Sequence, residues 1–405
     1  MHFWFVCNKC GKESPFNLKE SKCDCGGTLL VEYDLERVSK TLTKERLKNR
    51  STSMWRYSEL LPVENEKNIV SLGEGWTPLV RMNQAEEKYP VKKLWIKREE
   101  QNPTGSFKSR GFSSAISIAN EYGVSKVAVN SNGNAASALA AYASYAGMES
   151  HVFVPKDCPG LIVDECVQYG ASTFLVNGLI HDAGKIIEDG KQEQGWYNVG
   201  TLKEPGRAEG KKTMGLELAE QFNWNLPDVI VYPTGGGSGV IGIWNAFQQL
   251  KQLGFIEGDL PRMVSVQELG CDPIVSAMEN DSDFNSQTEN VISKPTGMRV
   301  PNPPDGDLIV SILRETNGTA VTVSKEEIEQ AQKTNGAQGI SSSPEGAATW
   351  AGFTRLVEQG WIKEDDEVVL FNTSHAMKYL PWEATGTPTI KTYEDWKKVS
   401  ENVLI

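Results

Sequence analysis

Short apolar runs alternate with longer amphipathic segments along most of the chain from residue 69 onward. A short apolar run predicts a strand, and apolar positions three and four apart predict a helix. The predicted strands are 94–97, 127–129, 151–154, 173–176, 229–232, 263–267 and 367–371, and the predicted helices are 109–122, 134–145, 161–169 and 240–251. Strands that alternate with helices indicate a parallel sheet covered by helices on both faces, so the predicted fold class is α/β.

Both ends of the chain depart from this pattern. Residues 1–33 are expected to form a separate small unit, and residues 34–66, which are rich in charge, a helical arm. Residues 381–405 are expected to form a tail helix after a loop. The Pro-rich stretch 294–307 is expected to be a surface loop.

Composition narrows the functions open to these 405 residues. Lys and Arg number 41 against 53 Asp and Glu, a formal net charge of −12, and an acidic chain repels nucleic-acid phosphates. No apolar run approaches the roughly 18 residues of a membrane span, and the N-terminal apolar stretch is too short for a secretory signal. We therefore expect a cytoplasmic protein that binds neither nucleic acid nor membrane. Four scattered histidines leave little material for a His metal site or a Ser-His-Asp triad.

Glycine dominates the turn between the predicted strand 229–232 and the predicted helix 240–251. The turn consists of Pro233, Thr234, Gly235, Gly236, Gly237, Ser238 and Gly239. Backbone N–H groups of such a turn point into one concavity and the helix N-terminus adds partial positive charge, so the turn predicts a phosphate-binding loop. A turn that only packs is the alternative. Dinucleotide binding is disfavoured, because the next strand ends at Gln267 and not at the acidic residue that should bind the ribose.

Two polar turns precede predicted helices further upstream. In the first, Pro103 and Gly105 make a rigid turn and Lys108 opens the helix. A helix N-terminus disfavours a cation and lowers a lysine pKa, which suits a lysine that forms an imine or transfers protons. Without this setting, Lys108 would be interpreted as a solvated surface charge. In the second turn, 130–137, backbone N–H groups can bind a carboxylate and Asn134 a phenolate oxygen, but an ordinary N-cap explains the residues equally well.

In this order, the lysine turn, the asparagine turn and the glycine loop resemble the fold-type II pyridoxal-phosphate enzymes, the tryptophan synthase β superfamily. Among these the chain most resembles the threonine synthase family. The resemblance covers roughly residues 5–380 and is carried by L-G-E-G-W-T-P-L at 72–79, N-P-T-G-S-F-K at 102–108, Q-E-L-G-C-D-P-I at 267–274 and P-E-G-A-A-T at 344–349.

The resemblance implies two doubly wound parallel-sheet domains of the tryptophan synthase β type. Residues 34–100 and 201–405 would form a large cofactor domain, and residues 101–200 a small mobile domain. Pyridoxal 5'-phosphate would be bound covalently by Lys108, which would also shuttle protons. Asn134 would hydrogen-bond the ring oxygen, and Thr373, or Ser374 in its place, would face the pyridine nitrogen. The phosphate would be bound by Gly235, Gly236, Gly237, Ser238 and Gly239.

The activity that the resemblance implies is conversion of O-phospho-L-homoserine and water to L-threonine and phosphate, by a homodimer. The candidate substrate-binding residues are Thr77, Ser106, Arg110, Ser131, Asn132 and Gly133. Arg110 could bind the substrate phosphate or form a salt bridge to a nearby Glu. Ser109 and Asn132 depart from the family pattern, so a dehydratase-like lyase or a β-replacement enzyme of the cysteate synthase type stays open. Retention of Lys108, Asn134 and the glycine loop argues against a binding protein without activity.

Four cysteines in the first 33 residues resemble the zinc ribbon at the N-terminus of many threonine synthases. They are Cys7, Cys10, Cys23 and Cys25. Four thiolates suit tetrahedral zinc. The second pair is one residue shorter than a Cys-x-x-Cys, so a degenerate ribbon held together by packing is the alternative to a zinc site.

Overall fold

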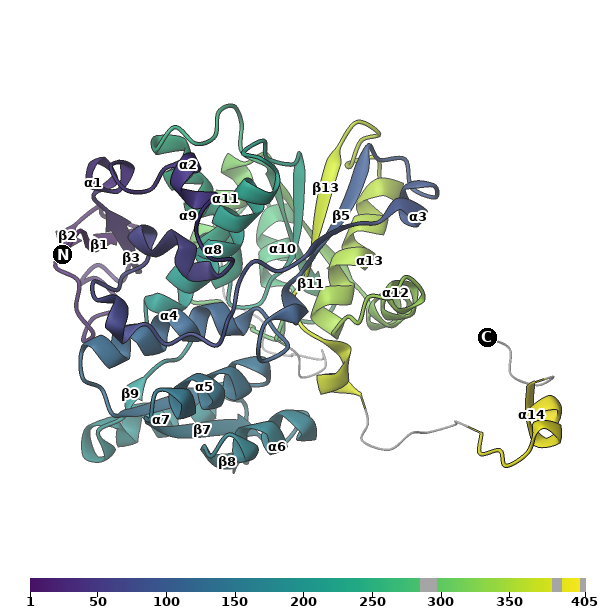
Figure 1. Cartoon of the computed structure of the whole chain (residues 1–405), viewed down its shortest axis with the longest axis horizontal. Coiled ribbons are helices and arrows are strands. Elements are labelled where there is room, and N and C mark those ends of the chain that lie inside the picture. The colour runs from purple at the N-terminus through teal and green to yellow at the C-terminus, as the bar shows by residue number, and fades with distance from the viewer. Residues whose placement is uncertain (285–296, 381–387, 401–405) are drawn as a thin grey trace.

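The computed structural model describes residues 1–284, 297–380 and 388–400. These residues form two parallel sheets, each between layers of helices, and a small antiparallel sheet at the N-terminus (Figure 1). In Figure 1 the larger helix-covered sheet lies above the smaller one, and the N-terminal sheet lies at the left. Within the described ranges, no helix is long and apolar enough to cross a membrane.

The larger sheet has six strands, and alternate residues of its strand β10 face two separate cores. Ile230 and Tyr232 pack into one core, whereas Val229 and Val231 pack into the other. Strand β4 runs antiparallel to β5, and all other neighbours are parallel. In sheet order the strands are β12 (Thr319–Val323), β11 (Arg262–Glu268), β10 (Val229–Pro233), β13 (Glu367–Asn372), β5 (Lys93–Arg98) and β4 (Leu79–Arg81).

Helices cover both faces of this sheet. One core contains residues of α8 (Gly206–Gln221), α9 (Ser238–Gln252), α10 (Pro273–Glu279) and α11 (Gly306–Glu315). The other contains residues of α3 (Asn83–Glu86), α12 (Lys325–Ala337) and α13 (Pro344–Glu358). Helix α8 is buried on nearly every side because it lies between α9 and α4 (Lys108–Glu121).

The smaller sheet is parallel throughout. Its strands in order are β8 (Ser172–Val176), β7 (Glu149–Pro155), β6 (Lys126–Asn130) and β9 (Tyr197–Asn198). Helices α4, α5 (Asn134–Tyr145) and α6 (Gly160–Gln168) supply the core on one face, and α7 (Ile180–Gln194) the core on the other. All four strands lie within residues 101–200, and the six strands of the larger sheet lie within 34–100 and 201–405. Movement of the smaller domain stays a prediction.

The N-terminal unit is a three-stranded antiparallel sheet in the order β2 (Glu13–Ser14), β1 (Phe3–Cys7), β3 (Leu29–Tyr33). Phe3 and Phe5 of β1 pack into the same core as α8 and α9, which fastens the unit to the larger sheet. In place of one helical arm, residues 34–66 contain several short helices. These are α1 (Leu35–Ser39), α2 (Lys44–Leu47) and η1 (Met54–Leu60), followed by η2 (Glu66–Asn68). The Thr43 side chain caps α2, which is why a new helix begins there.

Every strand and helix predicted from the apolar pattern occurs, with ends that differ by at most two residues. The tail contains α14 (Tyr393–Ser400), and 381–387 and 401–405 lie outside the described residues. The remaining short helices are η3 (Glu99–Gln101) and η4 (Ala376–Tyr379). The prediction of a simple surface loop at 294–307 is wrong for its described part, because Met298 is 1% exposed and lines a cavity. Residues 294–296 are not among the described residues.

Candidate active site

A cavity of about 300 Å³ opens between the two parallel sheets. It lies at the carboxyl ends of β6, β10 and β13, the edge at which open α/β sheets bind their ligands. Segment 130–135 of the smaller sheet forms part of its wall. Segments 235–239 and 297–304 and Thr373, from the larger domain, form further parts of the wall.

The glycine loop forms part of this wall, and at two of its positions the structure disfavours any residue other than glycine. Gly237 has a φ of +79°, in the left-handed region that favours glycine, and Ser238 begins α9. A Cβ at Gly239 would lie 2.2 Å from the hydroxyl oxygen of Tyr232. The loop therefore brings backbone N–H groups and a helix N-terminus to the cavity, an arrangement that suits a phosphate group.

Lys108 is the first residue of α4, and the exposed part of its side chain lines the cavity. Its Nζ lies 4.3 Å from the centroid of the Phe107 ring. Burial and then the charge on Arg207 lower the pKa of Lys108 to about 7, although the carboxylate of Glu345 partly opposes them. An amine that is partly neutral near pH 7 is a competent nucleophile and proton acceptor. Desolvation and a neighbouring cation thus add to the helix N-terminus on which the sequence prediction rests.

The asparagine turn brings four polar positions to the cavity: Ser131, Asn132, Gly133 and Asn134. Ser131 Oγ accepts a hydrogen bond from the Gly133 N–H at 3.0 Å and so stabilises the turn. Asn134 Nδ2 donates to Ser374 Oγ at 2.9 Å and to the Tyr379 hydroxyl at 2.8 Å. Oδ1 of Asn132 and Oδ1 of Asn134 are buried and have no hydrogen-bond partner within the described part of the chain. Unpaired buried atoms at a cavity wall are groups that a bound ligand can satisfy.

The turn after β13 supplies two hydroxyl groups, of which one faces the cavity. Thr373 lines the cavity. Ser374 lies behind it, 1% exposed, and is hydrogen-bonded to Asn134. The Thr373 carbonyl also accepts a hydrogen bond from the Phe107 N–H at 3.0 Å, which joins this turn to the lysine turn. Position therefore favours Thr373 over Ser374 for contact with a ring nitrogen.

Glu345 and Tyr379 belong to the site although the sequence analysis gives neither a role. Glu345, in the first turn of α13, lines the cavity and is 6% exposed. Its Oε1 accepts hydrogen bonds from the Tyr379 hydroxyl at 2.8 Å and from the Gly297 N–H at 2.7 Å, and its Oε2 is buried without a partner. Tyr379 thus connects Asn134 in the smaller domain with Glu345 in the larger one. The P-E-G-A-A-T segment is the sequence signal for Glu345, and no motif marks Tyr379.

Arg110 does not line the cavity, so the prediction that it binds the substrate phosphate is wrong for this structure. Its side chain is fully buried, and its Nε and Nη2 each donate to Glu99 at 2.7 Å. Nη1 and Nη2 donate to Glu217 at 2.8 and 3.0 Å. Lys97 joins the cluster, so two cations face two carboxylates. A salt bridge to a nearby Glu, the alternative role that the sequence left open for Arg110, is what the structure contains. Glu99 and Glu217 occupy all three guanidinium nitrogens, which leaves none for a phosphate.

The acidity of Glu217 follows from the same cluster. Burial opposes its ionisation, but the charges of Arg110 and Lys97 outweigh burial and lower the pKa of Glu217 to about 2. Thr77 belongs here too, because its hydroxyl donates to Glu99 at 2.7 Å. Thr77 therefore does not reach the cavity either.

Ser106 does not line the described cavity wall either. It is fully buried, and its backbone pairs with that of Ser374. Of the six predicted substrate-binding residues, the structure brings Ser131, Asn132 and Gly133 to the cavity. Further polar residues of the wall were not predicted: His181, Thr201, Lys203 and Asn302. His181 belongs to the first turn of α7, whereas Thr201, Lys203 and Asn302 lie in loops, and no local motif marks any of them.

Two buried cations of α8 lie near Lys108. Arg207 Nη1 donates to the Val199 carbonyl at 2.8 Å, while its Nε and Nη2 are buried without partners. Lys211 Nζ donates to Ser238 Oγ at 2.6 Å. Burial, followed by the charges of Lys108 and Arg207, holds the pKa of Lys211 well below its usual value. Three cationic groups therefore gather beside the cavity, which suits anionic ligands.

Comparison with known proteins gives this site its context. A family model described as "Pyridoxal-phosphate dependent enzyme" matches residues 70–374. The threonine synthase of Methanocaldococcus jannaschii is 35% identical over 374 residues, which cover 92% of each chain. The chain belongs to the threonine synthase family. The threonine synthase of Methanosarcina acetivorans is 36% identical over 375 residues, 92% of this chain and 91% of that one.

Solved structures of more distant enzymes share the fold of this threonine synthase family member. Diaminopropionate ammonia lyase from Escherichia coli superposes with a TM-score of 0.65 at 18% identity, over 76% of this chain and 87% of that one. Maize serine racemase superposes with a TM-score of 0.61 at 20% identity, over 81% of this chain and 93% of that one. Identities this low support the fold alone. Together with the family model that matches residues 70–374, these two superpositions confirm the fold-type II class predicted from the sequence.

The cavity fits the pyridoxal phosphate on which this family depends. Lys108 and Thr373 line the cavity, and the glycine loop suits the phosphate. The unpaired Oδ1 of Asn134 adds bonding capacity at the same wall. The cofactor predicted from the sequence is thereby confirmed, whereas the role of each residue stays a prediction.

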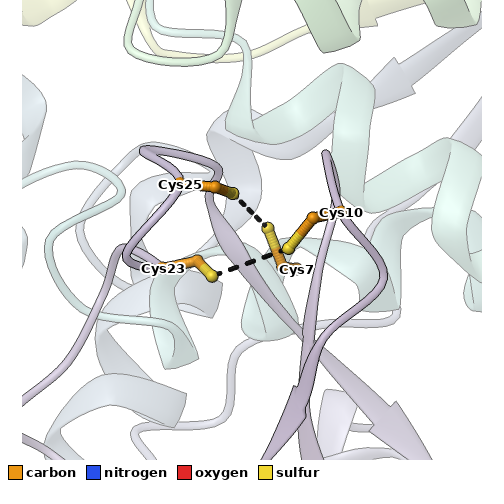
Figure 2. A group of neighbouring side chains, drawn as sticks. All are labelled: Cys7, Cys10, Cys23 and Cys25. Carbon is orange, nitrogen blue, oxygen red and sulfur yellow. Dashed lines mark hydrogen bonds between the residues drawn. The ribbon is translucent and has the colours of Figure 1, made fainter.

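The four predicted metal ligands of this threonine synthase family member converge at the N-terminal sheet (Figure 2). Sγ of Cys7 lies 3.4 Å from Sγ of Cys25, and Sγ of Cys10 lies 3.7 Å from Sγ of Cys23. All four sulfur atoms lie within 4.8 Å of one another. Sulfur atoms around a tetrahedral zinc lie about 3.8 Å apart, so the cluster is compatible with zinc. Gly27 permits the close approach, because a Cβ there would lie 2.5 Å from Cys7 Sγ.

Proposed function

We propose that this protein is a threonine synthase that converts O-phospho-L-homoserine and water to L-threonine and phosphate. The observation that carries the proposal is Lys108, an amine with a pKa of about 7 at a cavity that also contains the glycine loop. Identity of 35% to a threonine synthase across 92% of the chain supports the same chemistry.

Lys108 is placed to move the protons of this reaction. Pyridoxal phosphate, when bound, withdraws electrons from the substrate carbon that carries the amino group. The neutral amine of Lys108 would take a proton from Cα and later one from Cβ, and would return one proton to Cγ and one to Cα. Phosphate would leave from Cγ with the bonding electron pair, and water would add its hydroxide at Cβ while its proton goes to the released phosphate, so no oxidant or reductant is needed. A hydroxyl such as that of Thr373 would leave the ring nitrogen unprotonated, which suits elimination and replacement over transamination.

The polar wall offers partners for both ends of the substrate. The backbone N–H and the side-chain amide of Asn132 would bind the substrate carboxylate, beside Ser131 and Gly133, whose own N–H groups donate to the Phe153 carbonyl and to Ser131 Oγ. Two cations other than Arg110 are available for the phosphate. Lys203 lines the cavity, whereas Arg207 lies behind its wall, where two of its nitrogens have no hydrogen-bond partner among the described residues, and would act on the phosphate only through its charge.

Turnover of the purified protein with O-phospho-L-homoserine tests the proposal. Phosphate and threonine should appear in equal amounts, and Lys108→Ala should abolish both together with the visible absorption of the bound cofactor. Absence of both products in a sample that retains the cofactor absorption would contradict the proposal. Turnover by Lys108→Ala would contradict the role of the lysine.

Ser109 and Asn132, the two residues that depart from the family pattern, give little support to the alternative reactions, a dehydratase-like elimination or a β-replacement. Ser109 is fully buried, and its Oγ lies 2.8 Å from Thr104 Oγ1, so it stabilises the lysine turn. Asn132 does line the cavity and is the residue to vary if the protein prefers O-phosphoserine, serine or threonine. A homodimer and a cytoplasmic location remain our expectations, and sedimentation of the purified enzyme tests the first.

A further inference from the structure

Lys211 lies directly behind the glycine loop, and the proposed reaction gives it no role. It is fully buried in α8, and its Nζ donates to Ser238 Oγ at 2.6 Å. Ser238 is the first residue of α9 and lines the cavity, whereas Lys211 does not reach the cavity wall. Among the described residues, Ser238 is the one hydrogen-bond partner of Lys211.

Positive charge outweighs negative charge around Lys211. The other fully buried lysines are paired, Lys97 with Glu217 and Lys212 with Glu209. Lys211 forms no ion pair within the described part of the chain, and its charged neighbours are two cations, Lys108 and Arg207, against one carboxylate, Glu204. Burial and the two neighbouring cations disfavour the charged form of Lys211, and an anion bound beside it would favour that form. The arrangement is therefore complete only when an anion binds beside it.

The neighbouring glycine loop indicates that this anion is a phosphate. Ser238 belongs to the loop, and the loop's backbone N–H groups and helix N-terminus suit a phosphate. An ammonium group is a donor only, so Ser238 Oγ accepts from Lys211 and its own hydroxyl proton stays free to be donated into the cavity. The cofactor phosphate would be held at this loop, so the substrate phosphate would have to bind elsewhere at the cavity.

We propose that Lys211 is the positive partner of the cofactor phosphate, acting through Ser238 as a positioning residue and not as a cavity contact. The inference rests on the pyridoxal phosphate of the family and is independent of the amino-acid substrate proposed above. It adds a buried charge to a loop that would otherwise bind the phosphate through uncharged groups alone.

Binding of pyridoxal phosphate and of pyridoxal, which lacks the phosphate, tests this proposal. Cofactor-free wild-type protein and Lys211→Gln are titrated with each compound, followed by visible absorption. Lys211→Gln should raise the Kd of pyridoxal phosphate about tenfold or more, the size of a lost charge-assisted hydrogen bond. The Kd of pyridoxal should change less than about twofold, because the missing charge has no phosphate to meet. Equal changes for both compounds, or no change for either, would overturn the proposal.

Lys212→Gln is the matched control, since Lys212 is the adjacent buried lysine of α8 and pairs with Glu209 at 2.5 Å. It should lower thermal stability and leave the ratio of the two dissociation constants unchanged. A ratio that changes as much in Lys212→Gln as in Lys211→Gln would assign the effect to the helix and overturn the specific role of Lys211. None of these measurements depends on turnover.

Wild-type protein allows a second measurement if Lys211→Gln does not fold. A phosphate monoester normally loses its second proton near pH 6, and a neighbouring ammonium group favours the dianion. The phosphorus-31 NMR shift of the bound cofactor should therefore stay constant from about pH 5 to about pH 8. Titration of the bound phosphate with a midpoint near pH 6 would overturn the proposal.

Discussion

The guanidinium of Arg110 and the carboxylate of Glu217 are joined by two hydrogen bonds, from Nη1 to Oε2 at 2.8 Å and from Nη2 to Oε1 at 3.0 Å. Both side chains are fully buried. The pair fastens α4 to α8 two residues after Lys108, the residue on which the proposed reaction depends. Arg110 therefore supports the active site from behind.

Arg110→Gln should unfold more easily than the wild type by about 3–5 kcal/mol, because Glu99 and Glu217 would remain buried with one cation fewer. Urea unfolding measures the loss. Arg81→Gln is the control, since Arg81 pairs with Glu86 at the surface and its removal should cost about 1 kcal/mol or less. A variant with wild-type stability and a higher KM for the phosphorylated substrate would show that Arg110 binds substrate after all.

The rate at which cofactor-free protein binds pyridoxal phosphate covalently should rise with pH through about 7 and then level off. Burial and Arg207 disfavour the ammonium form of Lys108, so the reactive neutral amine predominates above its pKa of about 7. Stopped-flow absorption across a series of pH values gives the midpoint. Glu345→Gln should shift that midpoint downward, because the Glu345 carboxylate favours the ammonium form. A rate that still rises near pH 10 would contradict the lowered pKa.

Tyr379→Phe should weaken cofactor binding about tenfold, because Asn134 loses one of its two hydrogen bonds and Glu345 loses one of its donors. Titration of the cofactor-free variant measures the change. Tyr145→Phe is the control, since Tyr145 ends α5 and is 65% exposed. An affinity equal to that of the wild type would show that the connection between the two domains does not position Asn134.

Purified protein should contain about one zinc ion per chain, and Cys10→Ser should lower both the zinc content and the melting temperature. The visible absorption of the cofactor should persist, because the cysteine cluster lies in the N-terminal sheet and not at the cavity. Elemental analysis and calorimetry check these outcomes. Cys158→Ala, outside the cluster, should keep the full zinc content. Zinc-free wild-type protein with an unchanged melting temperature would favour the degenerate ribbon.

Local sequence alone was sufficient to locate the elements to which the proposed chemistry is assigned. Lys108, Asn134 and the glycine loop each lie where a strand or turn leads into a helix, and these junctions depend on neighbouring residues. The turn preferences of Gly, Pro and Asn and the period of the apolar residues act over a few positions. For that reason the predicted ends of the elements agree with the structure to within two residues.

Helix α8 contains contacts that local sequence does not predict. Its charged residues suggest a solvated segment, yet nearly all of its side chains are buried. Glu217, in α8, is 107 residues from Arg110, and Tyr379 is 245 residues from Asn134. No local pattern reveals such partners.

The sequence by itself thus determined the cofactor, the fold class and the position of the candidate lysine, because these follow from short contiguous motifs. Only the tertiary structure decided which charges pair with one another and which face the cavity. It removed Arg110 and Thr77 from the substrate site and brought Glu345, Arg207 and Lys211 to the neighbourhood of Lys108. The physical reason is that a buried charge is stable only beside its partner, and that partner is chosen by packing between distant segments.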